Sequence, residues 1–247
     1  MSKRKKTRKY RFGGVLGDRL IKEALQKGLM AVDPWEPWMD GGLPARNSSI
    51  DLRVGLDFIV PPDEEVIIGR TCIKEWLGRG KHFTLKPGEM FELEPGAFVV
   101  AQTLETVLLP TVRLKPHTGV PLFGGRFGGV SENARFGLWV EGAPVIHPSP
   151  TARPIALELK NMRGGTKPTK VVAGESRAGQ LQIYPIIGPI DHRKGRWDGQ
   201  TKPHGVCVED HSFIGGVQEL LDQGSAIDGS SNSLLTVAGG APRNGQV

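Results

Sequence analysis

The chain has 247 residues, enough for one large domain with tails, and its 34 glycines and 19 prolines stand mostly between short apolar runs. This composition favours strands and turns over long helices. No window holds 18 consecutive apolar residues and no apolar stretch directly follows the basic start, which argues against a transmembrane span and a secretory signal. We therefore expect a cytoplasmic protein without membrane contact (in the host cytoplasm if the protein is viral).

The positive charge is concentrated at the amino terminus. Residues 1–11 hold seven Lys or Arg side chains and no acid, which leaves 25 of the 32 basic side chains against 26 acidic ones. We expect residues 1–12 to form a flexible basic arm. One interpretation of this arm is a solvated tail, and the other is contact of residues 1–11 with nucleic acid or another polyanion.

Cysteine and histidine usage gives little support to a metal centre. Cys72 and Cys207 lie far apart without a C-x-x-C pair, which indicates a reducing compartment and thiols that are simply packed or exposed. The six histidines lack ligand spacing, and the H-x-E and P-C-x-x-C signature of zinc deaminases is absent. The sequence predicts no metal held by protein side chains.

The first predicted element is a helix. Its apolar stripe consists of Leu20, Ile21, Ala24 and Leu25. Asp18 is expected to cap the start of this helix and Gly28 its end. Residues 33–46, rich in proline, tryptophan and glycine, are predicted to form a loop.

Short strands separated by turns follow. The predicted strands span residues 49–54, 57–60, 83–85, 90–93, 97–101, 107–110, 138–146, 154–160, 169–173 and 180–187. Pro-Gly turns at 87–88 and 95–96 favour an antiparallel meander or barrel. Residues 116–129 are interpreted as a glycine-rich insertion. We expect one mainly β domain over residues 13–214 and a flexible tail over 215–247, with a short helix near 217–221.

Two segments near the middle of the chain carry the candidate chemistry. Residues 131–138 form a polar, glycine-flanked turn that offers hydroxyl, amide and guanidinium donors for an anion. Residues 155–159 have the period-two layout of a strand, with Glu158 on the face opposite Ile155, Leu157 and Leu159. Together the two segments are expected to place one carboxylate beside an anion-binding loop.

These segments belong to a larger set of motifs in a fixed order. The set comprises Leu16-Gly17-Asp18-Arg19, the segment from Asn47 to Gly55, Ser131 to Leu138 followed by Glu158, Gly179-Gln180-Leu181, and the segment from Arg196 to Gln200. With these motifs, residues 13–205 resemble the dCTP deaminases of the trimeric dUTPase-like superfamily. The resemblance implies a distorted antiparallel β-barrel that forms homotrimers, with active sites at subunit contacts.

The resemblance also implies an activity and a set of site residues. The activity is zinc-independent hydrolytic deamination of dCTP, or a related deoxycytidine nucleotide, to dUTP and ammonia, with Mg²⁺ arriving on the triphosphate. Glu158 corresponds to the catalytic glutamate, and Ser131 and Arg135 to the phosphate-binding and water-positioning residues. The expected substrate-binding residues are Arg126, His147, Ala156, Leu157, Arg196, Trp197 and Gln200.

Each assignment has a simpler alternative. The alternative for Glu158 is the solvent-exposed face of a strand, paired with Lys160. The alternative for Arg135 is neutralising Glu132 or Glu141. Asp51 and Arg53 lie on one face of a strand and suit either a structural ion pair or a role near the site. In the last predicted motif, Gln200 suits a plain loop and Trp197 suits either a cap over the base or a cover over the core.

Three departures from the family pattern bear on activity. Val130 and Glu132 stand where the family has arginine and serine, which weakens the attraction for a triphosphate unless Arg126 compensates. His147 replaces an aspartate and argues against dUTPase-type water activation. Ala143-Pro144 puts a proline in the strand that lines the family's base pocket. The alternatives are therefore a dUTPase or bifunctional deaminase–dUTPase, a modified or monophosphate substrate, a catalytically silent nucleotide-binding relative, and a virus-type structural protein.

Overall fold

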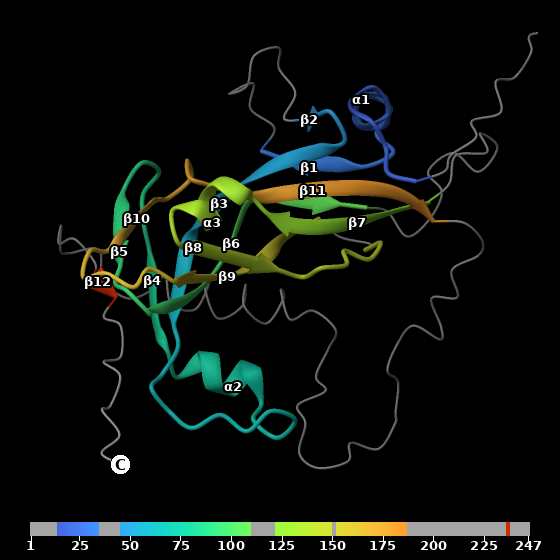
Figure 1. Cartoon of the computed structure of the whole chain (residues 1–247). Helices are drawn as coiled ribbons and strands as arrows, with labels where there is room; N and C mark the ends of the chain where they lie inside the picture. Colours follow the sequence, from blue (N-terminus) through green and yellow to red (C-terminus); the bar gives the residue numbers. More distant parts are fainter. Residues whose placement is uncertain (1–13, 35–44, 110–121, 150–151, 187–235, 238–247) are drawn as a thin grey trace, which may run out of the picture.

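The computed structural model describes residues 14–34, 45–109, 122–149, 152–186 and 236–237 (Figure 1). Its helices are α1 (Asp18–Gln26), α2 (Ile73–Gly78) and α3 (Ser131–Arg135). Its strands are β1 (Ala31–Asp33), β2 (Ala45–Arg46), β3 (Ser49–Val60), β4 (Lys81–Thr84), β5 (Met90–Leu93), β6 (Phe98–Leu108), β7 (Leu122–Gly129), β8 (Leu138–Gly142), β9 (Arg153–Asn161), β10 (Thr169–Val172), β11 (Arg177–Ile186) and β12 (Thr236–Val237).

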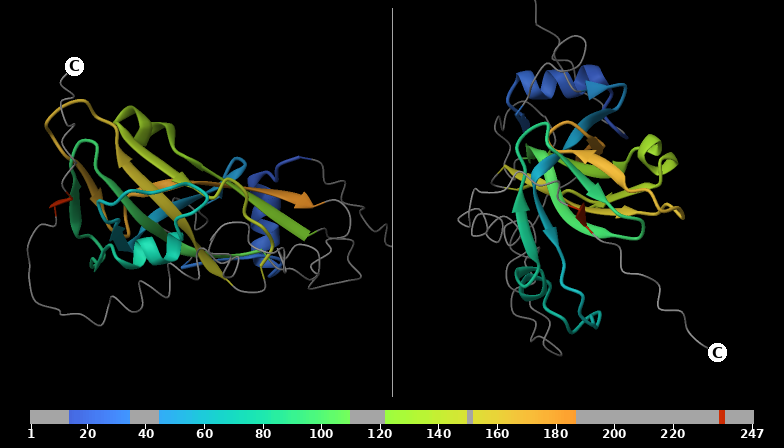
Figure 2. Two further views of the ribbon diagram at one scale, coloured as in Figure 1. Left: turned by 90° about the horizontal axis from the view of Figure 1, so that it is seen from below. Right: turned by 90° about the vertical axis from the view of Figure 1, so that its left-hand side faces the viewer.

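Nine strands form one antiparallel sheet that curls into a near-closed barrel (Figures 1 and 2). The main path runs β7-β11-β3-β6-β9-β8, with β1 added to β6 and with β2 and β4 added to β3. Its two end strands approach each other closely, because a Cβ on Gly129 of β7 would lie 2.6 Å from the carbonyl oxygen of Val140 in β8. The predicted mainly β, antiparallel barrel with a short N-terminal helix is confirmed.

The inward faces of these strands form the core together with β5, which belongs to a second, smaller sheet. The largest side chains there include Phe58 of β3 and Phe91 of β5, both fully buried. Their ring centroids lie 4.5 Å apart, and Phe83 of β4 stacks on Phe58 at 5.3 Å. Aromatic pairs at this separation add to the burial of apolar surface, so this cluster ties β3, β4 and β5 together.

The first helix forms where its apolar stripe predicts. Ile21, Ala24 and Leu25 are buried, and Gly28 has a φ of 65°, the left-handed conformation that commonly ends a helix. The expected cap is wrong in one detail. Gly17 is the N-cap residue, while the Asp18 side chain accepts a hydrogen bond from the Arg19 amide instead.

The interpretation of residues 116–129 as an insertion is wrong for 122–129. These residues form β7, which pairs with β11 along its whole length from Gly129↔Gly179 to Leu122↔Ile186. A Cβ on Gly124 would lie 2.7 Å from the Tyr184 ring. Glycine at this position therefore reflects the close approach of a neighbouring side chain in a sheet.

The two apolar runs predicted over 97–101 and 107–110 belong to a single strand, β6. Between them, Thr103 and Glu105 are buried but hydrogen-bonded: the Thr103 hydroxyl accepts from the Ile155 amide at 2.9 Å and donates to the Glu105 carbonyl at 2.7 Å. The Glu105 carboxylate accepts from Nε of Arg53 at 2.7 Å. Because partners satisfy these groups, the strand continues through the polar stretch.

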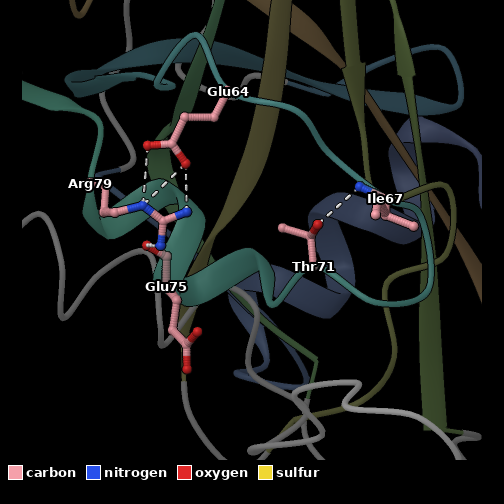
Figure 3. Close-up of polar contacts among 5 residues, drawn as sticks. All are labelled: Glu64, Ile67, Thr71, Glu75 and Arg79. Atoms are coloured by element: carbon pink, nitrogen blue, oxygen red, sulfur yellow. Dashed lines mark hydrogen bonds and ion pairs between the residues drawn. The ribbon is translucent and has the colours of Figure 1, made fainter.

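Residues 61–80 leave the barrel between β3 and β4 and carry α2, which the sequence did not predict. Glu64 and Arg79 join the two ends of this excursion, with Arg79 Nη2 donating to Glu64 Oε2 at 2.7 Å (Figure 3). This hydrogen bond lowers the pKa of Glu64. In α2, Leu77 packs with Ile59 and Val100 on the outer face of the barrel.

Within the same excursion Cys72 is disulfide-bonded, which corrects the expectation of a free thiol there. Cys207 lies outside the described residues.

A second, small sheet has the order β10-β5-β12. β12 lies in the predicted flexible tail and pairs in parallel with β5, through Thr236↔Glu92 and Val237↔Leu93. The predicted basic arm, most of the 33–46 loop, the short helix near 217–221 and the remainder of the tail lie outside the described residues. Among the helices that the structure describes, none has the length and apolar character needed to cross a membrane.

We predict that Gly129→Ala lowers the free energy of unfolding by about 1–3 kcal/mol, because the added methyl group meets backbone at the β7–β8 seam. Gly128→Ala is the matched control, since nothing lies within 4 Å of a Cβ there. Chemical denaturation of both variants at one protein concentration measures the difference. Equal stabilities would contradict the close approach of the two strands.

Candidate functional site

The segment predicted as an anion-binding turn is a short helix. Buried Val130 precedes α3, the helix ends at Arg135, and Gly137, with a φ of 81°, lets the chain reverse into β8. The Asn133 side chain donates a hydrogen bond to the carbonyl of Arg177 at 2.7 Å and so fastens α3 to β11. Ser131 and Arg135 remain exposed at the surface.

A polar pocket of about 390 Å³ lies between α3 and β11. Its lining consists of Val130, Ser131, Glu132, Arg135, Phe136, Arg177 and Gln180. The structure therefore brings two predicted site residues, Ser131 and Arg135, to one hollow and adds a second guanidinium and an amide. Glu132 contributes the opposing negative charge, as expected from the departure noted in the sequence.

A buried carboxylate behind this pocket holds two of its donors. Asp51 of β3 is 1% exposed and accepts a hydrogen bond from Nε2 of Gln180 at 2.9 Å. Its Oδ1 also lies 3.4 Å from Nη2 of Arg177. Asp51 thus restricts both side chains toward the pocket. The sequence left two alternatives for Asp51 and Arg53, a structural ion pair or a role near the site. Asp51 lies beside the site, while Arg53 forms a buried ion pair with Glu105.

An apolar pocket of about 390 Å³ adjoins the polar one and shares Val130 and Ser131 with it. Its other lining residues are Gly129, Ala134, Gly137, Leu138, Trp139, Val140 and Met162. Trp139 and Met162 are both more than half exposed. An apolar pocket beside a pocket rich in hydrogen-bond donors suits a ligand that has a planar base and a charged tail.

Glu158 lies on the outer face of β9, between β6 and β8. Its cross-strand neighbours are Val100 on one side and Glu141 on the other. Val100 is buried under Leu77 of α2, and Glu158 itself is half-buried. Burial, and to a smaller extent the charge of Glu141, raise the pKa of Glu158. In the described part of the chain no ion pair joins Glu158 to Lys160, the partner that the simpler alternative required.

The single chain does not bring Glu158 into either pocket beside α3. Ala156 shares the outer face with Glu158 and is buried, whereas the Leu157 side chain is fully buried in the core, so only its backbone is available to a ligand. Arg126 and His147 are exposed and line neither of these pockets. Arg196, Trp197 and Gln200 lie outside the described residues.

Sequence reasoning missed Arg177 and Glu141 as site residues and named Gln180 only within a motif. Arg177 and Gln180 lie in the first half of β11, a strand of ordinary pattern, and only the pairing of β11 with β3 brings them to Asp51. For Glu141 a signal existed. It lies two residues after Trp139 in β8 and so on the same face, as Glu158 lies two residues after Ala156 in β9. The register that pairs Glu141 with Glu158 is set by the tertiary structure. In the ranges that the structure covers, no three or more His, Cys, Asp or Glu side chains are grouped to hold a metal ion.

Comparison with known proteins decides the family. A "dCTP deaminase, dUMP-forming" from Acidothermus cellulolyticus is 30% identical to the chain over 206 residues, an alignment that covers 76% of this chain and 92% of that protein. The chain belongs to the dCTP deaminase family. A dCTP deaminase from Natronomonas pharaonis is 27% identical over 210 residues, covering 83% of this chain and the whole of that protein.

A solved structure agrees with this placement at the level of the fold. The 2'-deoxycytidine 5'-triphosphate deaminase from Agrobacterium tumefaciens superposes with a TM-score of 0.51 at 18% identity over 74% of this dCTP deaminase family member. The chain spans about half the length of that protein, 51%. No family model matches the chain.

The raised pKa of Glu158 leads to a prediction about stability. Folding raises this pKa above its ordinary value of 4.5, so the folded state binds the proton more tightly than the unfolded chain. The favourable contribution of Glu158 is complete below 4.5 and is lost as the pH rises through the folded pKa. Glu158→Gln does not titrate at this position. The stability of the variant relative to the wild type should therefore increase with pH across this window, as measured by urea denaturation. A difference that is constant with pH would contradict the assigned environment of Glu158.

Proposed function

We propose that this protein is an enzyme that hydrolytically removes the 4-amino group of dCTP or a related deoxycytidine nucleotide, releasing ammonia and giving dUTP. The observation that carries the proposal is the polar pocket. In a chain of the dCTP deaminase family, Ser131, Arg135, Arg177 and Gln180 converge on one hollow next to an apolar one.

The polar pocket is proposed to hold the phosphates. Arg135 and Arg177 offer planar guanidinium forks, which suit phosphate oxygens in a two-point contact. Ser131 and Gln180 add neutral donors, and Gln180 is already oriented by Asp51. Mg²⁺ is proposed to arrive on the triphosphate and to keep most of its ligands as phosphate oxygens and water. Arg126 and His147 are proposed to contact the nucleotide, and Arg196, Trp197 and Gln200 to cover it.

Glu158 is proposed as the general base and acid, with no zinc in the mechanism. Its ionised carboxylate takes a proton from water as the water oxygen bonds to C4 of the cytosine ring. The same carboxyl group then delivers that proton to the amino nitrogen, the C4–N bond breaks and ammonia leaves. The remaining hydroxyl proton passes to ring nitrogen N3 as the C4 carbonyl forms. Half-burial beside Val100 supports this role, because a carboxyl group with raised proton affinity can serve both steps.

The reaction site is proposed to form between copies of the chain in a homotrimer. Glu158 occupies the outer face of the barrel and lines neither of the pockets at α3, so one copy alone does not join the base to the phosphate pocket. Exposed apolar side chains at the α3 end of the barrel, Phe136, Trp139 and Met162, are available to be covered by a neighbour. A contact that brings another copy's Glu158 to this end would complete the site.

A second candidate function is release of dUMP rather than dUTP. The Acidothermus cellulolyticus relative is named as a dUMP-forming enzyme. His147 favours the simpler deamination, because no carboxylate stands at that position to activate a second water. A catalytically silent nucleotide-binding relative is a further alternative, since Glu132 lines the phosphate pocket and opposes its positive charge.

We expect purified wild-type protein with dCTP and Mg²⁺ to release ammonia and dUTP in equal amounts, and Glu158→Gln to bind dCTP without turnover. Chromatography of the nucleotides and an ammonia assay measure this outcome. Accumulation of dUMP and pyrophosphate would establish the second candidate. Nucleotide binding without any product in the wild type would establish the silent relative.

The shared site predicts complementation between two inactive variants. Glu158→Gln and Arg135→Ala are each expected to lose nearly all activity, because one lacks the base and the other a phosphate contact. Subunits of the two variants, mixed after dissociation and reassembled together, should regain activity, since some sites then combine an intact Glu158 with an intact Arg135. Each variant reassembled alone is the control. Absence of recovery in verified mixed oligomers would mean that both residues serve the same site from one chain.

A further inference from the structure

Two carboxylates face each other on the outer surface of the barrel. Glu141 of β8 and Glu158 of β9 are direct cross-strand partners in the antiparallel ladder. Side chains in such a pair project from the same face with their Cβ atoms about 5 Å apart. Like charges in this position repel, so the arrangement is unfavourable for the sheet alone.

An indole holds the first of these carboxylates in place. Trp139 lies two residues before Glu141 on the same face of β8, and its Nε1 donates a hydrogen bond to Oε2 of Glu141 at 3.2 Å. This contact limits the freedom of the Glu141 side chain to turn away from Glu158.

The other groups around Glu158 leave Glu141 as its principal charged neighbour among the described residues. From β9 itself, Lys160 lies on the same face but opposite Trp139. From β6, the facing residues are the uncharged Phe98, Val100 and Gln102, and α2 adds Leu77 and Trp76. From β3, Asp57 lies beyond Gln102, whose side chain donates to it at 3.2 Å, and it also accepts from Thr84 of β4 at 2.7 Å.

We propose that Glu141, anchored by Trp139, is a positioning residue that faces Glu158 and strengthens it as a base toward the attacking water. This inference rests on the proposed function, in which Glu158 takes and returns a proton. When Glu158 takes the proton from water, the repulsion between the two carboxylates is relieved, and the bond from the water oxygen to C4 forms at the same time. The proton then passes to the amino nitrogen, and the carboxylate pair is restored as ammonia leaves.

The test follows Glu158 directly by NMR titration of its ¹³C-labelled carboxyl carbon, assigned by the loss of its signal in Glu158→Gln. In Glu141→Gln the titration of Glu158 should move to lower pH, because a facing negative charge is gone. Trp139→Phe should move it in the same direction by less, since Glu141 remains but is no longer held. Glu92→Gln, in the separate small sheet where Glu92 pairs with Lys170, is the matched control and should leave it unchanged.

The acidic limb of the kcat/KM profile for dCTP should shift to lower pH in Glu141→Gln by the same amount as the NMR titration. A Glu158 titration that is unchanged in Glu141→Gln overturns the inference, whatever the enzymatic activity. A titration that shifts in a protein without deaminase activity supports the coupling of the two carboxylates and overturns the proposed function instead. The two failures are therefore distinguishable.

Discussion

The antiparallel register of β9 between β6 and β8 is the constraint on which the candidate chemistry depends. It places Glu158 opposite Glu141 and Val100 on the outer face, while Leu157 and Leu159 fill the core. Because side chains alternate with a period of two, a slip of one residue would drive Glu158 into the barrel interior and two leucines to the surface. The hydrophobic core therefore specifies the position of the carboxylate, and α2 adds to its burial by covering Val100.

The seam of the barrel and the polar pocket have a common structural cause. Gly129 allows β7 to approach β8 at backbone distance, and the chain between these strands is too short to form more than α3. α3 therefore stays at the seam, where it faces the start of β11. Pairing of β11 with β3 then brings Arg177 and Gln180 over Asp51. The pocket is thus assembled from three parts of the chain that are far apart in sequence, and each of them is held by the sheet.

Several of these arrangements are unfavourable for folding alone. A half-buried carboxyl group faces a second carboxylate, and Asp51 is buried with one oxygen, Oδ2, lacking a hydrogen-bond partner among the described residues. Arg53 and Glu105 show a different solution, since they form a buried ion pair that satisfies the charge of the carboxylate within the barrel. A half-buried carboxyl group whose pKa is raised by burial, as for Glu158, is typical of functional sites, whereas a buried ion pair of two side chains is typical of structure.

The sequence alone determined the local features. Period-two alternation predicted most strands, the apolar stripe predicted α1, and the ordered motifs predicted the family that the comparisons confirm. The glycine-rich β7 and the polar centre of β6 escaped prediction, because close backbone approach and buried hydrogen-bond partners are supplied by strands distant in the chain. Only the tertiary structure decided that Asp51 orients Arg177 and Gln180 and that Glu141 meets Glu158. Those pairings follow from strand register, and register is set by packing of the whole core rather than by any local pattern.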